Sequence, residues 1–481
     1  MCADKARMAA VSPEALALNR FGLGARPDET RPTNPRNWLL DQFARYDVRP
    51  AAFVALPDAS SLYRAYADEQ AMQRQTRQEL AGTNVDPRQD PAMRDARKDI
   101  RVQIRDAYRG AVNARLASAL ITQAPFVERL THFWANHFAL SIEKPQVSIY
   151  AGSYEADAIR PHVLGRFEDM LLAVERHPAM LFYLDQFRSV GPDSRAALLV
   201  AERRPDRTLG LNENLAREIM ELHTLGVRTG YSQADVTEFA RALTGWSVGG
   251  VGPQAGRDGG NVGGFLFRPG IHEPGSRTIM GKTYADEGEG QARSLLQDLA
   301  ASPATARHIS TKLARHFVAD DPPPALIDRL AASFLKSGGD LPTLYRTLVE
   351  APEAWIGAAP KFKSPWDWTV SALRGLGRRD IGKIDAAPML NQLGQPVWRP
   401  GSPAGYDDIT ATWAAPDALM RRVELAQRFA QGAGGQIDAR ALAPNLLPGT
   451  VSVETTTALA QADSGVTALA LLLVSPDFQR R

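Results

Sequence analysis

Hydrophobic residues recur along most of this chain at the three- and four-residue spacing of amphipathic helices. Residues 36–46 place Trp38, Leu39 and Phe43 on one face, and residues 93–119 repeat charged positions around a thin apolar stripe. This pattern predicts a mainly α fold, a large multi-helix protein. Its other helices are expected at 124–140, 213–225, 232–245, 289–300, 303–318, 323–337, 340–351, 364–377, 416–431 and 453–475.

A Gly-rich segment at residues 247–285 interrupts the helical pattern. Residues 265–267 and 277–280 favour strands, and the stretch 269–275, which contains Pro and Gly, lies between them. These features predict one short β-hairpin. The segment has glycines but no phosphate-binding loop pattern, so a nucleotide site is not indicated.

The length of the chain predicts more than one lobe. A single hydrophobic core stops growing near roughly 250–300 residues, and this chain has 481. We expect an N-terminal helical lobe at 1–246, the Gly-rich segment at 247–285 and a C-terminal helical lobe at 286–481. The first lobe includes a charged helical hairpin near 65–119, with a turn at 82–91, whose mixed charges favour a solvated face.

Composition excludes several classes of site. Lys and Arg total 56 against 54 for Asp and Glu, a balance that gives no sign of a nucleic-acid-binding surface. Cys2 is the single cysteine, which excludes an intrachain disulfide framework and a CxxC zinc or redox site. No uncharged apolar stretch reaches the roughly 18 residues of a membrane span. Because the N-terminus lacks the apolar segment of a signal peptide, a cytoplasmic protein is expected, with partner-assisted export to the periplasm as the alternative.

Residues 211–226 hold the densest group of polar side chains that could do chemistry. On a helix, Glu213, Arg217 and Glu221 share a polar face with Asn214 and Glu218, opposite an apolar side. The simplest interpretation is a surface face with ion pairs at i,i+4 spacing. The alternative is a cleft, in which the excess negative charge would need a divalent metal or a further cation.

Two other segments contain histidine. His137 belongs to the buried stripe of residues 126–138, whereas His132 lies on a different face with Glu128. The two imidazoles are about 140° apart on a helix, so they cannot chelate one ion as an HExxH pair does. Ser364 followed by Pro365 predicts a helix start, and on the expected helix 303–318 the side chain of His316 is expected to pack against apolar neighbours.

Several segments together resemble the bacterial family catalogued as domain of unknown function 1800. The resemblance covers nearly the whole chain, and its most specific part is the Asn-Glu-Asn…Arg-Glu…Glu-Leu-His…Gly run within 212–226. One departure follows Gln395-Pro396-Val397-Trp398: this chain has Gly405-Tyr406 where the family typically has Gly-Trp. The other matching segments are Asn19–Gly24, Thr131–Phe138, His177–Asp185, Gly230–Trp246, His272, Lys312–Pro323 and Lys363–Pro365.

The resemblance implies a mainly helical domain whose signature lies on the 213–226 helix. It also implies a neighbouring protein as partner, sulfatase-like and belonging to the family called domain of unknown function 1501, whose members often carry export signals. We therefore expect a functional cleft between the helices at 128–137 and 213–223, with the loop of His272.

Two hypotheses about function follow. In the first, the protein is an enzyme, hydrolytic or metal-dependent, that acts alongside the sulfatase-like partner. Its catalytic residues would be Glu218, Glu221 and Arg217, its substrate-binding residues Asn214, Arg241 and Lys282, and its ligands for a divalent metal His132, His223 and His272. In the second, the protein is a non-catalytic accessory or binding protein for that partner.

Overall fold

The computed structural model describes residues 11–79, 91–204, 206, 209–251, 261–357 and 361–481. It confirms the mainly helical fold, with two small two-stranded antiparallel sheets in the described part. Within the same residues, no helix has both the length and the apolar character needed to cross a bilayer. Cys2 lies outside these ranges. The predicted turn at 82–91 also lies outside them, except for residue 91.

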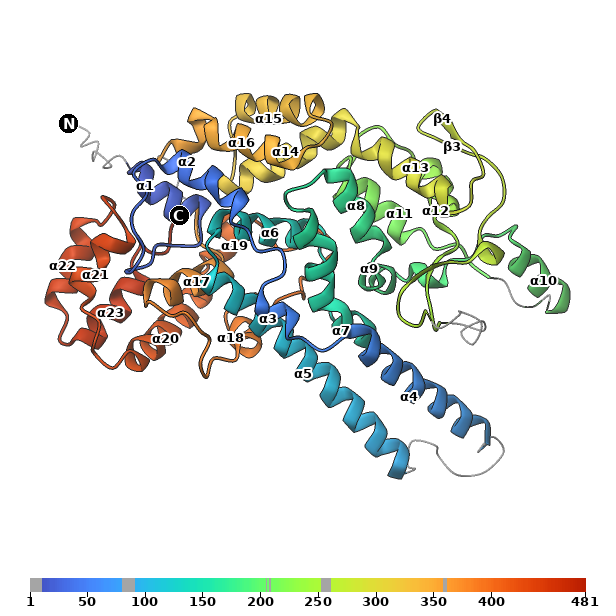
Figure 1. Cartoon of the computed structure of the whole chain (residues 1–481), viewed down its shortest axis with the longest axis horizontal. Helices are drawn as coiled ribbons and strands as arrows, with labels where there is room; N and C mark the ends of the chain where they lie inside the picture. The colour runs from blue at the N-terminus through green and yellow to red at the C-terminus, as the bar shows by residue number, and fades with distance from the viewer. Residues whose placement is uncertain (1–10, 80–90, 205, 207–208, 252–260, 358–360) are drawn as a thin grey trace.

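The N-terminal half is a series of helices from which one pair projects. Helices α4 and α5 leave the body as an arm (Figure 1), joined across by Arg97, which donates to Gln73 at 3.0 Å. The helices are α1 (Pro13–Ala15), continued by π-helix Leu16–Phe21, α2 (Pro35–Leu40), continued by 3-10 helix Asp41–Ala44, α3 (Ala51–Val54), α4 (Ala59–Glu79), α5 (Pro91–Ile121), α6 (Pro125–His137), α7 (Pro145–Tyr154), continued by π-helix Glu155–Ile159, α8 (Phe167–Arg176), α9 (Pro178–Tyr183), α10 (Arg195–Arg203), α11 (Asn214–Glu218), continued by π-helix Ile219–His223, and α12 (Gln233–Leu243).

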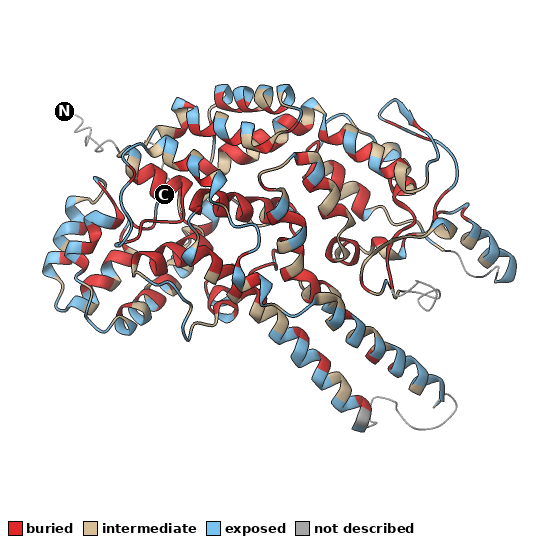
Figure 2. Ribbon diagram, in the orientation of Figure 1, coloured by how far each residue is buried: buried red, intermediate tan, exposed pale blue. Residues whose placement is uncertain are grey.

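The C-terminal half packs against the same core. Buried apolar side chains from Ala17 to Phe478 form one cluster that includes residues of both predicted lobes, and Figure 2 shows the buried positions concentrated along α6 and α17. The division into lobes stays a prediction. The helices are α13 (Glu289–Ala300), α14 (Pro303–Phe317), α15 (Pro324–Lys336), α16 (Leu341–Glu350), α17 (Pro365–Gly375), α18 (Ala386–Gln392), α19 (Thr410–Trp413), α20 (Pro416–Gly432), α21 (Ala439–Leu446), α22 (Val453–Gln461) and α23 (Gly465–Val474).

The predicted β-hairpin is wrong in its pairing. Strand β2 (Phe265–Phe267) pairs with β1 (Trp246–Val248), and β3 (Arg277–Ile279) pairs with β4 (Lys282–Tyr284). The β3–β4 turn consists of Met280 and Gly281, both at positive φ, which is the two-residue connection that suits a right-handed strand twist. The longer stretch at 269–275 therefore connects two sheets instead of closing one hairpin.

Two predicted helices also differ in detail. The 213–225 helix is confirmed, but its second half is the π-helix, and it ends before Gly226, which has a φ of 92°. The 453–475 helix is two helices, because Ser464 starts α23 by accepting a hydrogen bond from the backbone N–H of Thr467 at 3.0 Å. Side-chain capping of this kind competes with helix continuation. The capping box at Ser232 is confirmed.

A buried ion network fixes α6 to the helices behind it. We call Glu128, Arg160, Glu155 and Arg115 the inner ion network. Arg160 donates to Glu128 at 3.1 Å and lies 3.4 Å from Glu155, which pairs with Arg115 at 2.8 Å. Burial alone would raise the pKa of Glu128, but Arg160 holds it at about 2. Two acids and two guanidinium groups thus balance each other in the interior.

Breaking this network is expected to be costly. Glu128→Gln should lower the free energy of unfolding by about 3–5 kcal/mol, because it leaves two buried guanidinium groups to share the single carboxylate of Glu155. Glu221→Gln, in a half-exposed pair with Arg217 at 3.7 Å, should cost at most about 1 kcal/mol. Urea unfolding at neutral pH, followed by circular dichroism, measures both. Equal small losses would contradict the assigned role of the inner ion network.

Candidate functional site

The predicted catalytic residues lie on a half-exposed helix face. Arg217 pairs with Glu213 at 3.2 Å and with Glu221 at 3.7 Å, and it donates to Gln233 at 2.9 Å. Burial raises the pKa of Glu218 above its ordinary value. This face therefore has its ion pairs within itself, as the simplest sequence interpretation expects.

The predicted substrate-binding residues are dispersed. Asn214 is exposed at the start of α11. Arg241 pairs with the buried carboxylate of Glu273 at 3.3 Å, and Lys282, 60% exposed, pairs with Asp298 on the surface. Arg241 and Lys282 thus each form an ion pair with an acid of the protein itself.

The three histidines predicted as metal ligands have separate partners. His132 accepts a hydrogen bond from the indole N–H of Trp366 at 3.1 Å, and Nδ1 of His223 lies 2.7 Å from Glu175. His272 bonds the carbonyl of Thr244 at 2.7 Å. Across the described ranges, no three His, Cys, Asp or Glu side chains are grouped so that they could hold a metal ion.

The helices at 128–137 and 213–223 do meet, but through a different imidazole. Nε2 of His137 bonds the carbonyl of His223 at 3.1 Å, and Nε2 of His308 bonds the neighbouring carbonyl of Leu222 at 3.0 Å. Burial lowers the pKa of His308 to about 4, so at neutral pH it is an uncharged N–H donor. These contacts cap carbonyls that the end of a helix leaves unpaired.

A pocket lies between α6, α17 and the segment from 395 to 413. Its cavity volume is about 90 Å³, and it opens to solvent. Its lining includes the polar side chains of His132, His316 and Asp408, and that of Asp407, which is exposed. Most of the remaining wall is aromatic, contributed by Phe133, Phe362, Trp366, Trp398, Tyr406 and Trp413.

Local hydrogen bonds fix the segment that closes the pocket. The Asn136 side chain of α6 donates to the carbonyl of Tyr406 at 2.9 Å and accepts from its N–H at 2.8 Å. Gly405 has a φ of 83°, and a Cβ there would lie 2.3 Å from the carbonyl oxygen of Asn136. Glycine is therefore required at this close approach, and the Gly405-Tyr406 pair serves to dock this segment on α6.

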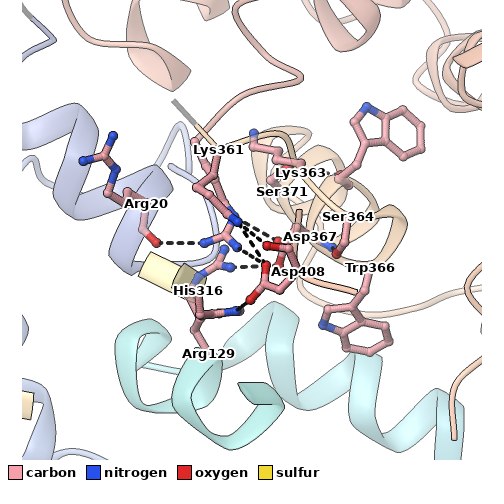
Figure 3. A network of polar contacts seen from close by, with 12 residues as sticks. Arg20, Arg129, His316, Lys361, Lys363, Ser364, Trp366, Asp367, Ser371 and Asp408 are labelled. Atoms are coloured by element: carbon pink, nitrogen blue, oxygen red, sulfur yellow. Dashed lines mark hydrogen bonds and ion pairs between the residues drawn. The ribbon is translucent and has the colours of Figure 1, made fainter. Parts of the chain in front are cut away.

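A second group of charges reaches the pocket through Asp367, Asp408 and Arg481, which are among its lining residues. We call Asp367, Asp408, Asp320, Arg129, Arg481 and Lys361 the outer ion network. Figure 3 labels four of them, Arg129, Lys361, Asp367 and Asp408. Asp367 accepts from Arg129 at 2.9 Å and pairs with Arg481 at 3.1 Å, and Lys361 pairs with Asp320 at 2.7 Å. Burial raises the pKa of Asp367, but the two arginines hold it well below its usual range. Three acids and three cations again balance.

His316 connects this network to the pocket. Its Nδ1 is hydrogen-bonded to a carboxylate oxygen of Asp408 (Figure 3), and its Nε2, which is buried, has no partner among the described residues. The ring packs between Phe133 and Phe317. Burial lowers the pKa of His316 below its ordinary value, although Asp408 opposes the shift. The imidazole is therefore neutral near pH 7, with Nδ1 as the donor and a lone pair on Nε2.

Sequence reasoning assigned this site to packing. His316 was expected on an apolar stripe, and the 364–368 region was expected only to start a helix. Ser364 does cap α17, accepting from the N–H of Asp367 at 3.1 Å, and this start brings Trp366 and Asp367 to the pocket. No local spacing indicates the pair, because Asp408 lies 92 positions from His316.

A family model described as "Protein of unknown function (DUF1800)" matches residues 16–480. Nothing matches among the curated proteins or the solved structures.

Proposed function

The chain belongs to the DUF1800 family, and because the description of that family names no activity we propose a function from the pocket: an enzyme that performs general acid–base chemistry of a hydrolytic kind. His316 is the base and Asp408 orients it. The substrate occupies the pocket between α6, α17 and the segment from 395 to 413.

One observation carries this proposal, the arrangement of the His316 imidazole. Its Nδ1 is bonded to a carboxylate, its buried Nε2 has no partner in the part of the chain that the structure describes, and the residue lines the pocket. A carboxylate on Nδ1 fixes the tautomer and stabilises the imidazolium that forms when Nε2 takes a proton. In hydrolysis, Nε2 would take that proton from a water molecule and return it to the leaving group.

The surroundings of His316 support the same role. The aromatic side chains lower the polarity of the pocket lining, which strengthens electrostatic interactions inside the pocket. Trp398 in the wall has a φ of 51°, a backbone conformation that is costly for a residue other than glycine. Strain of this kind is concentrated at functional sites.

Two substitutions distinguish the His316 pocket from the 213–223 helix face, on which the sequence analysis placed the catalytic residues. His316→Gln should lower turnover by about 10²–10⁴-fold, the usual contribution of a positioned base, whereas Glu218→Gln should retain most of it. A panel of p-nitrophenyl esters, glycosides and sulfates supplies the assay, with circular dichroism as the folding control. Loss in Glu218→Gln with full activity in His316→Gln would move the chemistry to the 213–223 helix.

The pH dependence tests the role of Asp408. Because burial lowers the pKa of His316, the rate should rise with pH along an acid limb whose midpoint lies below the ordinary histidine value of 6.5. Asp408→Asn removes a charge that raises this pKa, so the limb should move to still lower pH while the maximal rate falls. Profiles of kcat/KM between about pH 4 and about pH 9 measure the shift. A limb that moves to higher pH would contradict the assignment.

We also propose, as the second candidate, that the chain binds a sulfatase-like partner protein. The observation that favours it is the projecting arm of α4 and α5, on which Met72 is 51% exposed and Val102 37%. These two exposed apolar side chains lie on a projecting element, where a partner protein can reach them.

Co-purification tests the second candidate. Replacing Met72 and Val102 together by Glu should abolish co-elution with the sulfatase-like protein, because it puts charge into an apolar contact. His316→Gln should leave co-elution intact. Co-elution that survives the double replacement would exclude the arm as the contact, and absence of co-elution for the unmodified chain would exclude the partner.

A further inference from the structure

Unpaired hydrogen-bond donors line the same pocket as His316. The indole nitrogen of Trp398, a residue only 5% exposed, has no partner in the described part of the chain. The Gln395 side-chain oxygen accepts from the N–H of Trp366 at 2.8 Å, which fixes the amide and leaves its NH₂ group to donate. The Ser364 oxygen accepts from the N–H of Asp367 at 3.1 Å, and an oxygen that accepts in this way still carries an O–H that can donate.

The Trp398 indole is held in place by its backbone. The backbone carbonyl of Trp398 accepts from the N–H of Ile142 at 3.0 Å, and the backbone carbonyl of Val397 accepts from the hydroxyl of Tyr108 at 3.0 Å. The ring also lies 5.7 Å from the Arg115 guanidinium. A buried donor without an acceptor is unfavourable, and here the surrounding contacts keep it in that position, as expected where a ligand supplies the acceptor.

The charges around the pocket disfavour an anionic ligand, and the exposed Asp407 in its lining adds a negative charge. Arg115 and Arg481, which line the pocket, are paired with Glu155 and with Asp367 and Asp408. The inner and outer ion networks each contain as many acids as cations. Neither network therefore has an uncompensated cation to offer a phosphate, sulfate or carboxylate group. The unpaired donors named above are neutral, and neutral donors suit an oxygen that carries lone pairs but no proton.

We infer that the pocket binds a neutral acyl compound, an ester or an amide, whose carbonyl oxygen accepts from the Trp398 indole with help from Gln395 and Ser364. This inference rests on the proposed function, because His316 is the base in both. It adds the substrate class and one catalytic residue, Trp398.

The reaction balances with water as the only co-reactant. Nε2 of His316 takes one proton from water, and the water oxygen bonds to the carbonyl carbon. The π electron pair of the carbonyl moves to its oxygen, where the Trp398 N–H stabilises the negative charge. The carbonyl re-forms, the bond to the alcohol or amine breaks, and that leaving group takes the proton from the imidazolium. The products are a carboxylic acid and an alcohol or amine.

A pair of Trp→Phe variants isolates the indole donor. Trp398→Phe keeps an aromatic ring and removes the N–H. Trp246→Phe is the matched control, because its indole nitrogen is also buried without a partner in the described residues but lies on β1, outside the pocket-lining set. With p-nitrophenyl butyrate, Trp398→Phe should lower kcat by about 10²–10³-fold, the usual effect of removing one donor to an oxyanion. Trp246→Phe should leave kcat unchanged.

A binding measurement gives a readout that does not depend on turnover. Benzyl trifluoromethyl ketone forms a hydrate that resembles the tetrahedral intermediate, and fluorine NMR follows its binding to the full chain. Trp398→Phe should raise its Kd by at least about tenfold, the equivalent of one hydrogen bond. Trp246→Phe should not change the Kd.

The outcomes separate this inference from the proposed function. Two results together support the proposed function and the acyl inference. His316→Gln and Trp398→Phe both lose ester turnover, and of the two Trp→Phe variants only Trp398→Phe binds the ketone more weakly. Turnover of a glycoside or sulfate that depends on His316, without ester turnover or ketone binding, overturns the acyl inference and keeps the proposed function. Ester turnover that survives His316→Gln overturns both. Equal ketone binding by Trp398→Phe and the unmodified chain overturns the role of Trp398.

Discussion

The structure depends on how two adjacent charged residues of one buried helix are satisfied. Glu128 and Arg129 of α6 are both buried, and the roughly 100° between neighbouring helix positions directs them to different sides. Glu128 accepts from Arg160 in the inner ion network, and Arg129 donates to Asp367 in the outer one. A buried charge is tolerated only when it is paired. The position and rotation of α6 are therefore fixed by acids and bases from both halves of the chain.

The site follows from that constraint. Because α6 is fixed, the Asn136 amide lies where it can hold the backbone of Tyr406. That contact docks the segment leading to Asp408, whose carboxylate then meets the imidazole of His316 on α14. Asp408 also lies 3.5 Å from Lys361 and 3.6 Å from Arg481. The contact between His316 and Asp408 thus depends on the packing of α6, although neither residue lies on that helix.

Helices were predictable from the sequence to a much greater extent than the site. Apolar spacing is a local signal, and it placed α6, α13 and α14 close to their observed bounds. Strand pairing is not local: Phe267 pairs with Trp246, and nothing in the 265–267 segment specifies that partner. The same limit hid the site, since Arg129 lies 238 positions from Asp367. In the densest polar run, at 211–226, Arg217 forms its ion pairs with glutamates of the same run, and His223 is buried against Glu175.

Charge pairing also explains why the pocket is chemically distinctive. If either ion network carried an unpaired charge, that charge would dominate the pocket and attract a counterion or water. With both networks balanced, the pocket nitrogens of His316 and Trp398 remain unpaired and uncharged in the described structure. One is an acceptor of protons and the other a donor of a hydrogen bond. In the proposed reaction, an uncharged base and an uncharged donor lining one pocket would stabilise negative charge as it develops, without first binding an anion in the ground state.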